Sequence, residues 1–213
     1  MKFLVISDIH SSMAVADWAD SVAEQEDVDC VLALGDITDF GPNEVAEKIL
    51  GPIKRNVYAI PGNTDPLSLP ETISEFAMDM HGKSAIIDGF HIAGLGGSNP
   101  TIFNTPFELD EDTIYSMLRP ISKEGMILMV HAPPYGINDM IPSGLNVGSR
   151  SILKIVQEFR PILVLSGHIH EDYGVRHIDG TTFVNPGPAK NGMYAIVEVD
   201  DGAVRAELFT VSD

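Results

Sequence analysis

The sequence has little of what stabilises secreted or membrane-spanning chains. Its single cysteine, Cys30, cannot form an intrachain disulfide, and its apolar surroundings in CVLALG favour a buried strand residue. No run of about eighteen apolar residues is present, so we expect no transmembrane helix. Asp8 and His10 interrupt the apolar start MKFLVISDIHSS, which also lacks a small-residue cleavage pattern and so argues against a signal peptide. We therefore expect a cytoplasmic protein without membrane contact.

Basic residues are also scarce. The chain has 13 lysines and arginines against 31 acidic residues, which gives a formal net charge of -18 at pH 7. Such a surface repels phosphate backbones, so polymeric nucleic acid is an unfavourable partner. The same charge excess would also keep the protein soluble, so it does not by itself select another partner.

The length and rhythm of the chain indicate one domain, residues 1–213, with a substantial core. Short apolar runs alternate with segments of helical period, and no repeat or long linker interrupts them. We predict strands at 2–7, 29–34, 57–60, 84–88, 90–95, 126–130, 162–165, 173–178, 181–184, 194–199 and 204–210. We predict helices at 13–26, with Ser11 or Ser12 as N-cap, and at 43–50, 109–118 and 149–159. The order βαβαβ, followed by mostly strands, predicts an α/β fold around mixed sheets.

Side chains that commonly bind metals follow five of the predicted strands directly. They occur in the segments SDIH, GDITD, GNTD, VHAPP and GHIH, and the candidates are Asp8, His10, Asp36, Asn63, His131, His168 and His170. The carboxyl ends of neighbouring parallel strands meet at one edge of a sheet, so we expect these side chains to converge.

The residue types point to transition metals. Carboxylate, amide oxygen and imidazole together suit borderline divalent ions, with Mn as the first choice and Fe, Ni, Co or Zn as alternatives. Four imidazoles argue against calcium or magnesium, and the lack of cysteine ligands argues against a structural zinc site. Seven candidates exceed what one tetrahedral ion needs, whereas two ions that share a carboxylate would use them all.

The five segments, in this order, resemble the calcineurin-like metallophosphoesterase superfamily. The resemblance runs from Asp8 to His170, and the short chain is similar to the small prokaryotic phosphodiesterase-type branch of that superfamily. It implies a four-layer sandwich of two mixed β-sheets flanked by helices. It also implies that a hydroxide bridging two metal ions attacks phosphorus, with Asp36, Asn63 and His131 central to catalysis.

The resemblance assigns a role to each ligand. Asp8, His10, Asp36 and His170 would hold the first ion. Asp36, Asn63, His131 and His168 would hold the second, so Asp36 would bridge the pair.

One position departs from the pattern of many relatives. Thr64 stands where they carry a histidine that pairs with the carboxylate at Asp39 and protonates the leaving group. Thr64 cannot act as an acid at neutral pH, although it could contact substrate. Without that partner, Asp39 is expected to hydrogen-bond Thr64 or cap the next helix, and Asp65 is expected to be a turn residue.

Residues outside the five segments carry weaker signals. Arg150 stands at a predicted helix start, where it could bind a phosphate or simply be a solvated cation. The polar loop 97–101 could line the site. We expect none of His81, His91 and His177 to bind metal.

The leading expectation is metal-dependent hydrolysis of a small or nucleotide-like phosphodiester. A phosphomonoesterase with the same site is the first alternative. The second is a non-catalytic scaffold protein of the same fold, which would be expected to lack ligands. The sequence leaves open whether the chain forms a homo-oligomer.

Overall fold

Strand β1 (Lys2–Ile6) shows how the protein is layered, because its side chains are buried on both faces. Leu4 and Ile6 face one cluster of apolar residues, and Phe3 and Val5 face another. The structure, a computed structural model, describes residues 1–211, and within that range the strands form two six-stranded sheets. The cluster around Phe3 and Val5 lies between the two sheets and takes side chains from both.

The first sheet has the strand order β12-β11-β1-β2-β3-β4. Its other members are β2 (Cys30–Ala33), β3 (Asn56–Ala59), β4 (Met78–Asp79), β11 (Met193–Asp200) and β12 (Ala203–Thr210). Strands β1 to β4 run parallel, and β11 and β12 are antiparallel additions at one side.

The second sheet has the order β5-β6-β7-β8-β10-β9. It comprises β5 (Lys83–Ile87), β6 (Phe90–Leu95), β7 (Ile127–Val130), β8 (Leu163–Leu165), β9 (Gly174–Ile178) and β10 (Thr181–Asn185). The four central strands are parallel, and an antiparallel strand closes each side.

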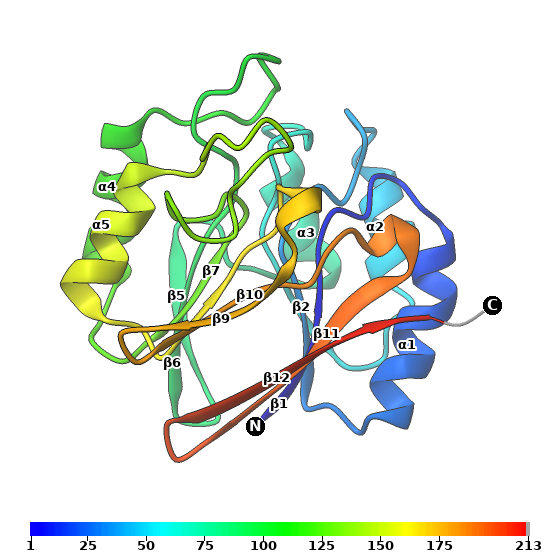
Figure 1. Ribbon diagram of the computed structural model, residues 1–213. Coiled ribbons are helices and arrows are strands. Elements are labelled where there is room, and N and C mark those ends of the chain that lie inside the picture. The colour runs from blue at the N-terminus through cyan, green and yellow to red at the C-terminus, as the bar shows by residue number, and fades with distance from the viewer. Residues whose placement is uncertain (212–213) are drawn as a thin grey trace.

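Helices cover the outer face of each sheet (Figure 1). Helices α1 (Ala14–Gln25), α2 (Glu44–Leu50) and α3 (Leu69–Phe76) pack on the first sheet. Helices α4 (Glu111–Leu118) and α5 (Arg150–Phe159) pack on the second. The predicted four-layer sandwich of two mixed sheets is therefore confirmed. Three short 3-10 helices, η1 (Arg119–Ile121), η2 (His170–Asp172) and η3 (Ala189–Asn191), lie in connections of the described chain, and none of its helices is long and apolar enough to cross a bilayer.

Two local predictions were wrong or incomplete. Helix α3 and strand β4 were not predicted, because α3 buries only Leu69 and Ile73 and β4 has two residues. Helix α1 has Met13 as N-cap without a side-chain hydrogen bond, so neither Ser11 nor Ser12 caps it. The Ser11 hydroxyl instead accepts the backbone N–H of Asp39, 2.9 Å away, and thereby joins the loops after β1 and β2.

Candidate metal centre

The structure brings the seven candidate ligands together where the two sheets meet. Asp8 and His10 follow β1, Asp36 follows β2, and Asn63 follows β3, all in the first sheet. The remaining three come from the second sheet: His131 follows β7, and His168 and His170 follow β8. The donor atoms fall into two groups, within each of which they lie within 4.8 Å of one another: Asp8, His10 and His170, and Asp36, His131 and His168.

Several of these residues have an unusual backbone conformation. Asp8, His10, Asp36 and His168 have φ angles of 55°, 47°, 48° and 68°, in the left-handed region that residues with a Cβ seldom adopt. Backbone hydrogen bonds hold the loop after β1 against the loop after β2. They run from Asp8 N to Gly35 O at 3.0 Å and from His10 N to Asp36 O at 2.7 Å. Such strain persists only where surrounding contacts enforce it, and it concentrates at functional sites.

The Asp36 carboxylate faces both groups. Its Oδ2 lies 3.6 Å from His10 Nε2 in the first group, and its Oδ1 lies 3.4 Å from His131 Nε2 in the second. The backbone N–H of Thr64 donates to Oδ1 at 2.9 Å and fixes the carboxylate plane. One carboxylate with an oxygen toward each group has the arrangement that a bridging ligand needs.

The hydrogen bonds of His131 test whether the second group suits a cation. Its Nδ1 lies 2.8 Å from the carbonyl oxygen of Leu34, so Nδ1 carries the proton and Nε2 holds the lone pair. That Nε2 faces Asn63 Oδ1 at 2.9 Å as well as the Asp36 carboxylate. A lone pair cannot hydrogen-bond an acceptor, so a proton or a metal ion among these three atoms would satisfy them all.

The pKa values of the histidines in the second group also show that this site favours a positive charge. Burial would lower the pKa of His131, but the Asp36 and Asp8 carboxylates and hydrogen bonds raise it to about 9. Burial and the neighbouring His131 lower the pKa of His168 to about 4. In the absence of a metal ion, a proton on His131 compensates Asp36. A divalent ion would take the place of that proton, so the donor set fits one.

The first group presents the same pattern. His10 Nε2 and His170 Nε2 face each other at 3.4 Å, and His170 Nε2 lies 3.2 Å from Asp8 Oδ1. Burial would raise the pKa of Asp8, but the hydrogen bond from His170 and the charge of His131 lower it, so the carboxylate stays charged. The backbone N–H of His168 donates to both Asp8 oxygens, at 3.2 and 3.1 Å, and ties the two sheets together at the site.

Two residues that sequence reasoning missed orient the Asn63 amide. Asn63 Nδ2 donates to Thr105 Oγ1 at 3.1 Å, which leaves Oδ1 directed at His131. The Thr105 hydroxyl in turn donates to Glu108 Oε1 at 2.8 Å. Both residues lie in the loop after β6, about forty positions along the chain from Asn63, so no local pattern could have linked them.

Asp65 is a second structural anchor and more than the turn residue that the sequence indicated. Its buried carboxylate accepts the backbone N–H groups of Ile37, Thr38 and Gly62 at 3.1, 2.7 and 2.7 Å. It therefore joins the loops after β2 and β3, which carry Asp36 and Asn63. A Cβ on Gly62 would overlap the backbone nitrogen and carboxylate of Asp36, which explains the glycine.

Thr64 and Asp39 do not pair with each other. The buried Thr64 hydroxyl donates to the carbonyl oxygen of Thr38 at 3.0 Å. Asp39 neither bonds Thr64 nor caps α2, whose N-cap is Asn43. Its exposed carboxylate has Oδ1 3.8 Å from His10 Nδ1, at the rim of the site.

The start of α5, where the sequence left Arg150 as either a phosphate contact or a solvated cation, already holds a carboxylate. Glu111 accepts the backbone N–H groups of Arg150 and Ser151 at 3.0 and 2.7 Å, and the Ser149 hydroxyl at 2.8 Å. The Arg150 guanidinium stacks over the Tyr135 ring, with its carbon 3.9 Å from the ring centre.

The remaining histidines stand outside both groups. His81 Nδ1 accepts the backbone N–H of Gly96 at 3.1 Å, His91 bonds the carbonyl oxygen of Ile121, and His177 bonds Thr182.

Lys190 was missed by the sequence reasoning. Burial is the largest cause that lowers the pKa of His10, and the charge of Lys190 lowers it further. The backbone N–H of Lys190 donates to Asp8 O at 3.3 Å, so the main chain of this residue lies beside the first group.

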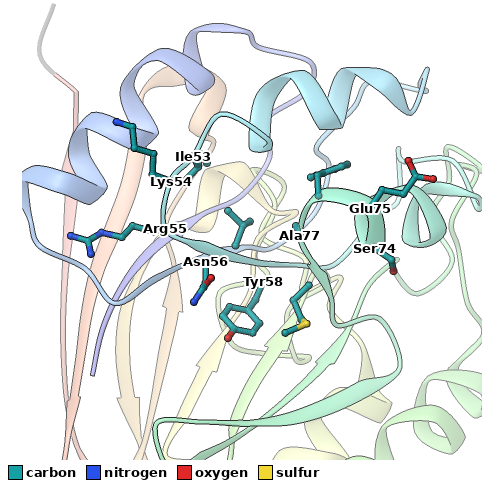
Figure 2. A pocket seen from close by; sticks show the side chains of 11 residues that line it. Ile53, Lys54, Arg55, Asn56, Tyr58, Ser74, Glu75 and Ala77 are labelled. Carbon is teal, nitrogen blue, oxygen red and sulfur yellow. The ribbon is translucent and has the colours of Figure 1, made fainter.

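A hollow of about 530 Å³ lies elsewhere, between the start of β3 and the end of α3 (Figure 2). It is at the opposite end of β3 from Asn63. Its two cations are already paired, Lys54 with Asp20 at 2.8 Å and Arg55 with Asp27 at 2.9 Å. Histidine is absent from its described lining, so the hollow offers no comparable chemistry.

Comparison with known proteins agrees with this geometry. A family model described as calcineurin-like phosphoesterase matches residues 1–172. An uncharacterized protein of Methanocaldococcus jannaschii is 35% identical over 204 residues, which cover 91% of each chain. A probable glycerophosphodiester phosphodiesterase of Arcobacter nitrofigilis is 27% identical over 154 residues, covering 67% of this chain and 56% of that protein. A solved structure described as a novel archaeal phosphodiesterase superposes with a TM-score of 0.60 at 17% identity, covering 98% of this chain and 100% of the other. This chain belongs to the calcineurin-like phosphoesterase family.

Proposed function

We propose that the protein is a binuclear metal-dependent phosphodiesterase, with residues 1–213 forming one catalytic domain. The observation that carries this proposal is the Asp36 carboxylate, which directs one oxygen toward each group of ligands. The core between the sheets takes residues from both, which supports a single domain. The names of the Arcobacter relative and of the archaeal neighbour favour a diester over a monoester substrate.

The first ion would be held by Asp8, His10 and His170, and the second by Asn63, His131 and His168, with Asp36 shared. Mn is the first choice of metal, with Fe, Ni, Co or Zn as alternatives. Two such ions would neutralise charge on the phosphate and make water a stronger nucleophile.

The protein's own part is to hold its ligands in place before substrate arrives. The Leu34 carbonyl fixes which nitrogen His131 presents, and Thr105 fixes which atom Asn63 presents. Thr64 holds Asp36 through its backbone N–H, and it is proposed only as a minor substrate contact, because its buried hydroxyl already donates to the Thr38 carbonyl oxygen. Arg150 is proposed only as a weak substrate contact, because its charge already stacks on Tyr135.

The test compares Asp36→Asn with Asp39→Asn in Mn-loaded protein. Wild-type protein should contain two ions per chain and hydrolyse bis(p-nitrophenyl) phosphate faster than p-nitrophenyl phosphate. Asp36→Asn should lose most of this activity and part of the bound metal, because both ions lose a charged ligand. Asp39→Asn removes an exposed carboxylate at the rim and should keep both ions.

Other outcomes would select the alternatives. A larger kcat/KM for p-nitrophenyl phosphate would indicate a phosphomonoesterase with the same site. At most one bound ion and no turnover of either ester would indicate a non-catalytic scaffold. The seven converging side chains argue against that last reading, because a degenerate site would be expected to have lost some of them.

A further inference from the structure

Exposed apolar side chains gather in the loops around the candidate metal centre. Residues 1–211 include twelve exposed large apolar side chains, and eight of them lie in the loops after β1, β2, β3, β6, β7 and β8. We call these eight the apolar rim; it consists of Met13, Phe40, Leu67, Ile102, Phe103, Met140, Leu145 and Tyr173. Figure 1 shows these loops at the same end of the molecule, above the strands.

Hydrogen bonds join neighbouring loops of the rim in pairs. Asn99 Nδ2, in the loop after β6, donates to Val147 O in the loop after β7 at 3.1 Å. The backbone N–H of Met140 donates to Asp172 beside Tyr173 at 2.9 Å. The backbone N–H of Phe40 donates to Thr64 O, next to Asn63, at 3.1 Å.

The same six loops contain no lysine or arginine, as the sequence of residues 7–13, 34–43, 60–68, 96–110, 131–149 and 166–173 shows. Three cations lie beside them: Arg150, which stacks on Tyr135, Arg176, which pairs with Asp172, and Lys190, whose charge reaches His10. Recognition of a second phosphate or of a nucleic-acid backbone would call for several cations in these loops. The loops instead offer apolar surface to whatever extends from a phosphate at the metal centre.

Ile102 and Phe103 are the most prominent part of the rim, with 89% and 77% of their surface exposed. Their loop is anchored rather than free. The Thr101 hydroxyl donates to Glu108 at 2.6 Å and accepts the backbone N–H of Phe103 at 3.1 Å. Phe103 is two residues from Thr105, which contacts the Asn63 amide, so its Cα lies within about 7 Å of the Thr105 Cα.

We propose that the apolar rim binds an apolar or aromatic ester group of a substrate that carries a single phosphate, with Ile102 and Phe103 as the principal contacts. This inference rests on the proposed phosphodiesterase function and names its substrate class. The phosphate supplies the only charge that the site must recognise. The ester group gains affinity by covering apolar side chains that otherwise face water.

The experiment uses two diesters that share a leaving group, phenyl p-nitrophenyl phosphate and methyl p-nitrophenyl phosphate. The double variant Ile102→Ser/Phe103→Ser should lower kcat/KM for the phenyl ester about tenfold, as expected for the loss of one aromatic contact. It should change kcat/KM for the methyl ester less than twofold. Ile86→Ser is the matched control, because Ile86 is 69% exposed on β5, outside the rim. This variant should leave kcat/KM unchanged for both the phenyl and the methyl ester.

Equal losses for the two esters, or no loss for the phenyl ester, would overturn the proposal. Binding of diphenyl and dimethyl phosphate, followed by saturation-transfer NMR, gives a readout independent of turnover. Wild-type protein that hydrolyses neither ester would refute the proposed function. A wild-type preference for diphenyl phosphate that the double variant abolishes would still support the rim, and equal binding would refute it. A wild-type dimer that becomes monomeric in the double variant would assign the surface to a second copy of the chain and also overturn the proposal.

Discussion

The contact between Asn63 and Thr105 allows a sharp test of how the second group is organised. Thr105→Val removes a hydroxyl and keeps nearly the same shape. The variant loses the acceptor that takes the Asn63 amide N–H at 3.1 Å. Without it, the amide can rotate and present Nδ2 instead of Oδ1 to a metal ion.

The magnitude follows from the bonds that are lost. A neutral hydrogen bond of this length contributes about 1 kcal/mol. Burial would raise the pKa of Glu108, but hydrogen bonds from Thr101 and Thr105 lower it, so a charged carboxylate polarises the Thr105 hydroxyl and strengthens the chain of bonds. Removing such a partner of a metal ligand typically costs ~10–100-fold in metal affinity. We expect about tenfold, equivalent to about 1.4 kcal/mol.

The assay is calorimetric titration of metal-free protein with Mn²⁺. Thr101→Val is the matched control, because Thr101 also donates to Glu108, at 2.6 Å, but its hydroxyl is not the one that holds Asn63. Thr105→Val should weaken one of two binding events about tenfold, and Thr101→Val should change both less than twofold. Equal effects of the two variants, or none for Thr105→Val in a folded protein, would refute the reasoning.

Three other positions give separate expectations. Thr64→His should raise the rate more as the leaving-group pKa rises, since a positioned acid contributes ~10²–10⁴-fold for poor leaving groups; an unchanged slope with metal content intact would show that another acid already acts. Gly62→Ala should reduce bound Mn and lower Tm by roughly 5–10 °C, because the new Cβ overlaps Asp36; full metal content at wild-type Tm would contradict this. Burial and the charge of Asp29 raise the pKa of the Cys30 thiol to about 12, so at pH 8 a thiol reagent should label it only after unfolding, and rapid labelling of the native protein would be inconsistent with the core.

The sequence predicted best the features that buried strands control. Each segment with candidate ligands follows a strand whose side chains are buried on both faces, and such strands appear as continuous apolar runs. The carboxyl ends of the strands meet at one edge within each sheet, and the resemblance placed the two sheets face to face, so convergence of the seven side chains was foreseeable. The ligand roles themselves stay a prediction until metal is measured.

Contacts between distant loops were beyond that reasoning. Thr105 and Glu108 act on Asn63 from another sheet, and the Asp65 carboxylate is shared by backbone groups of two loops. The Glu111 carboxylate accepts a backbone N–H group at the start of α5, which the prediction for Arg150 had assumed to be available for a phosphate. These hydrogen bonds depend on how the layers pack, so they cannot be predicted from the spacing of residues along the chain.

The split of the ligands between the two sheets has a consequence for the order of events during protein synthesis. The group of Asp8 and His10 is completed by His170, and the group of Asp36 and His131 is completed by His168. A nascent chain emerges from the ribosome amino end first, and early segments begin to fold while later ones are still being made. The segment GHIH is the last of the five to emerge, so neither group has its full set of donors until about four-fifths of the chain has been made. A metal ion could therefore meet a full set of donors in either group only after this segment has emerged, and β11 and β12 of the first sheet follow it in the chain.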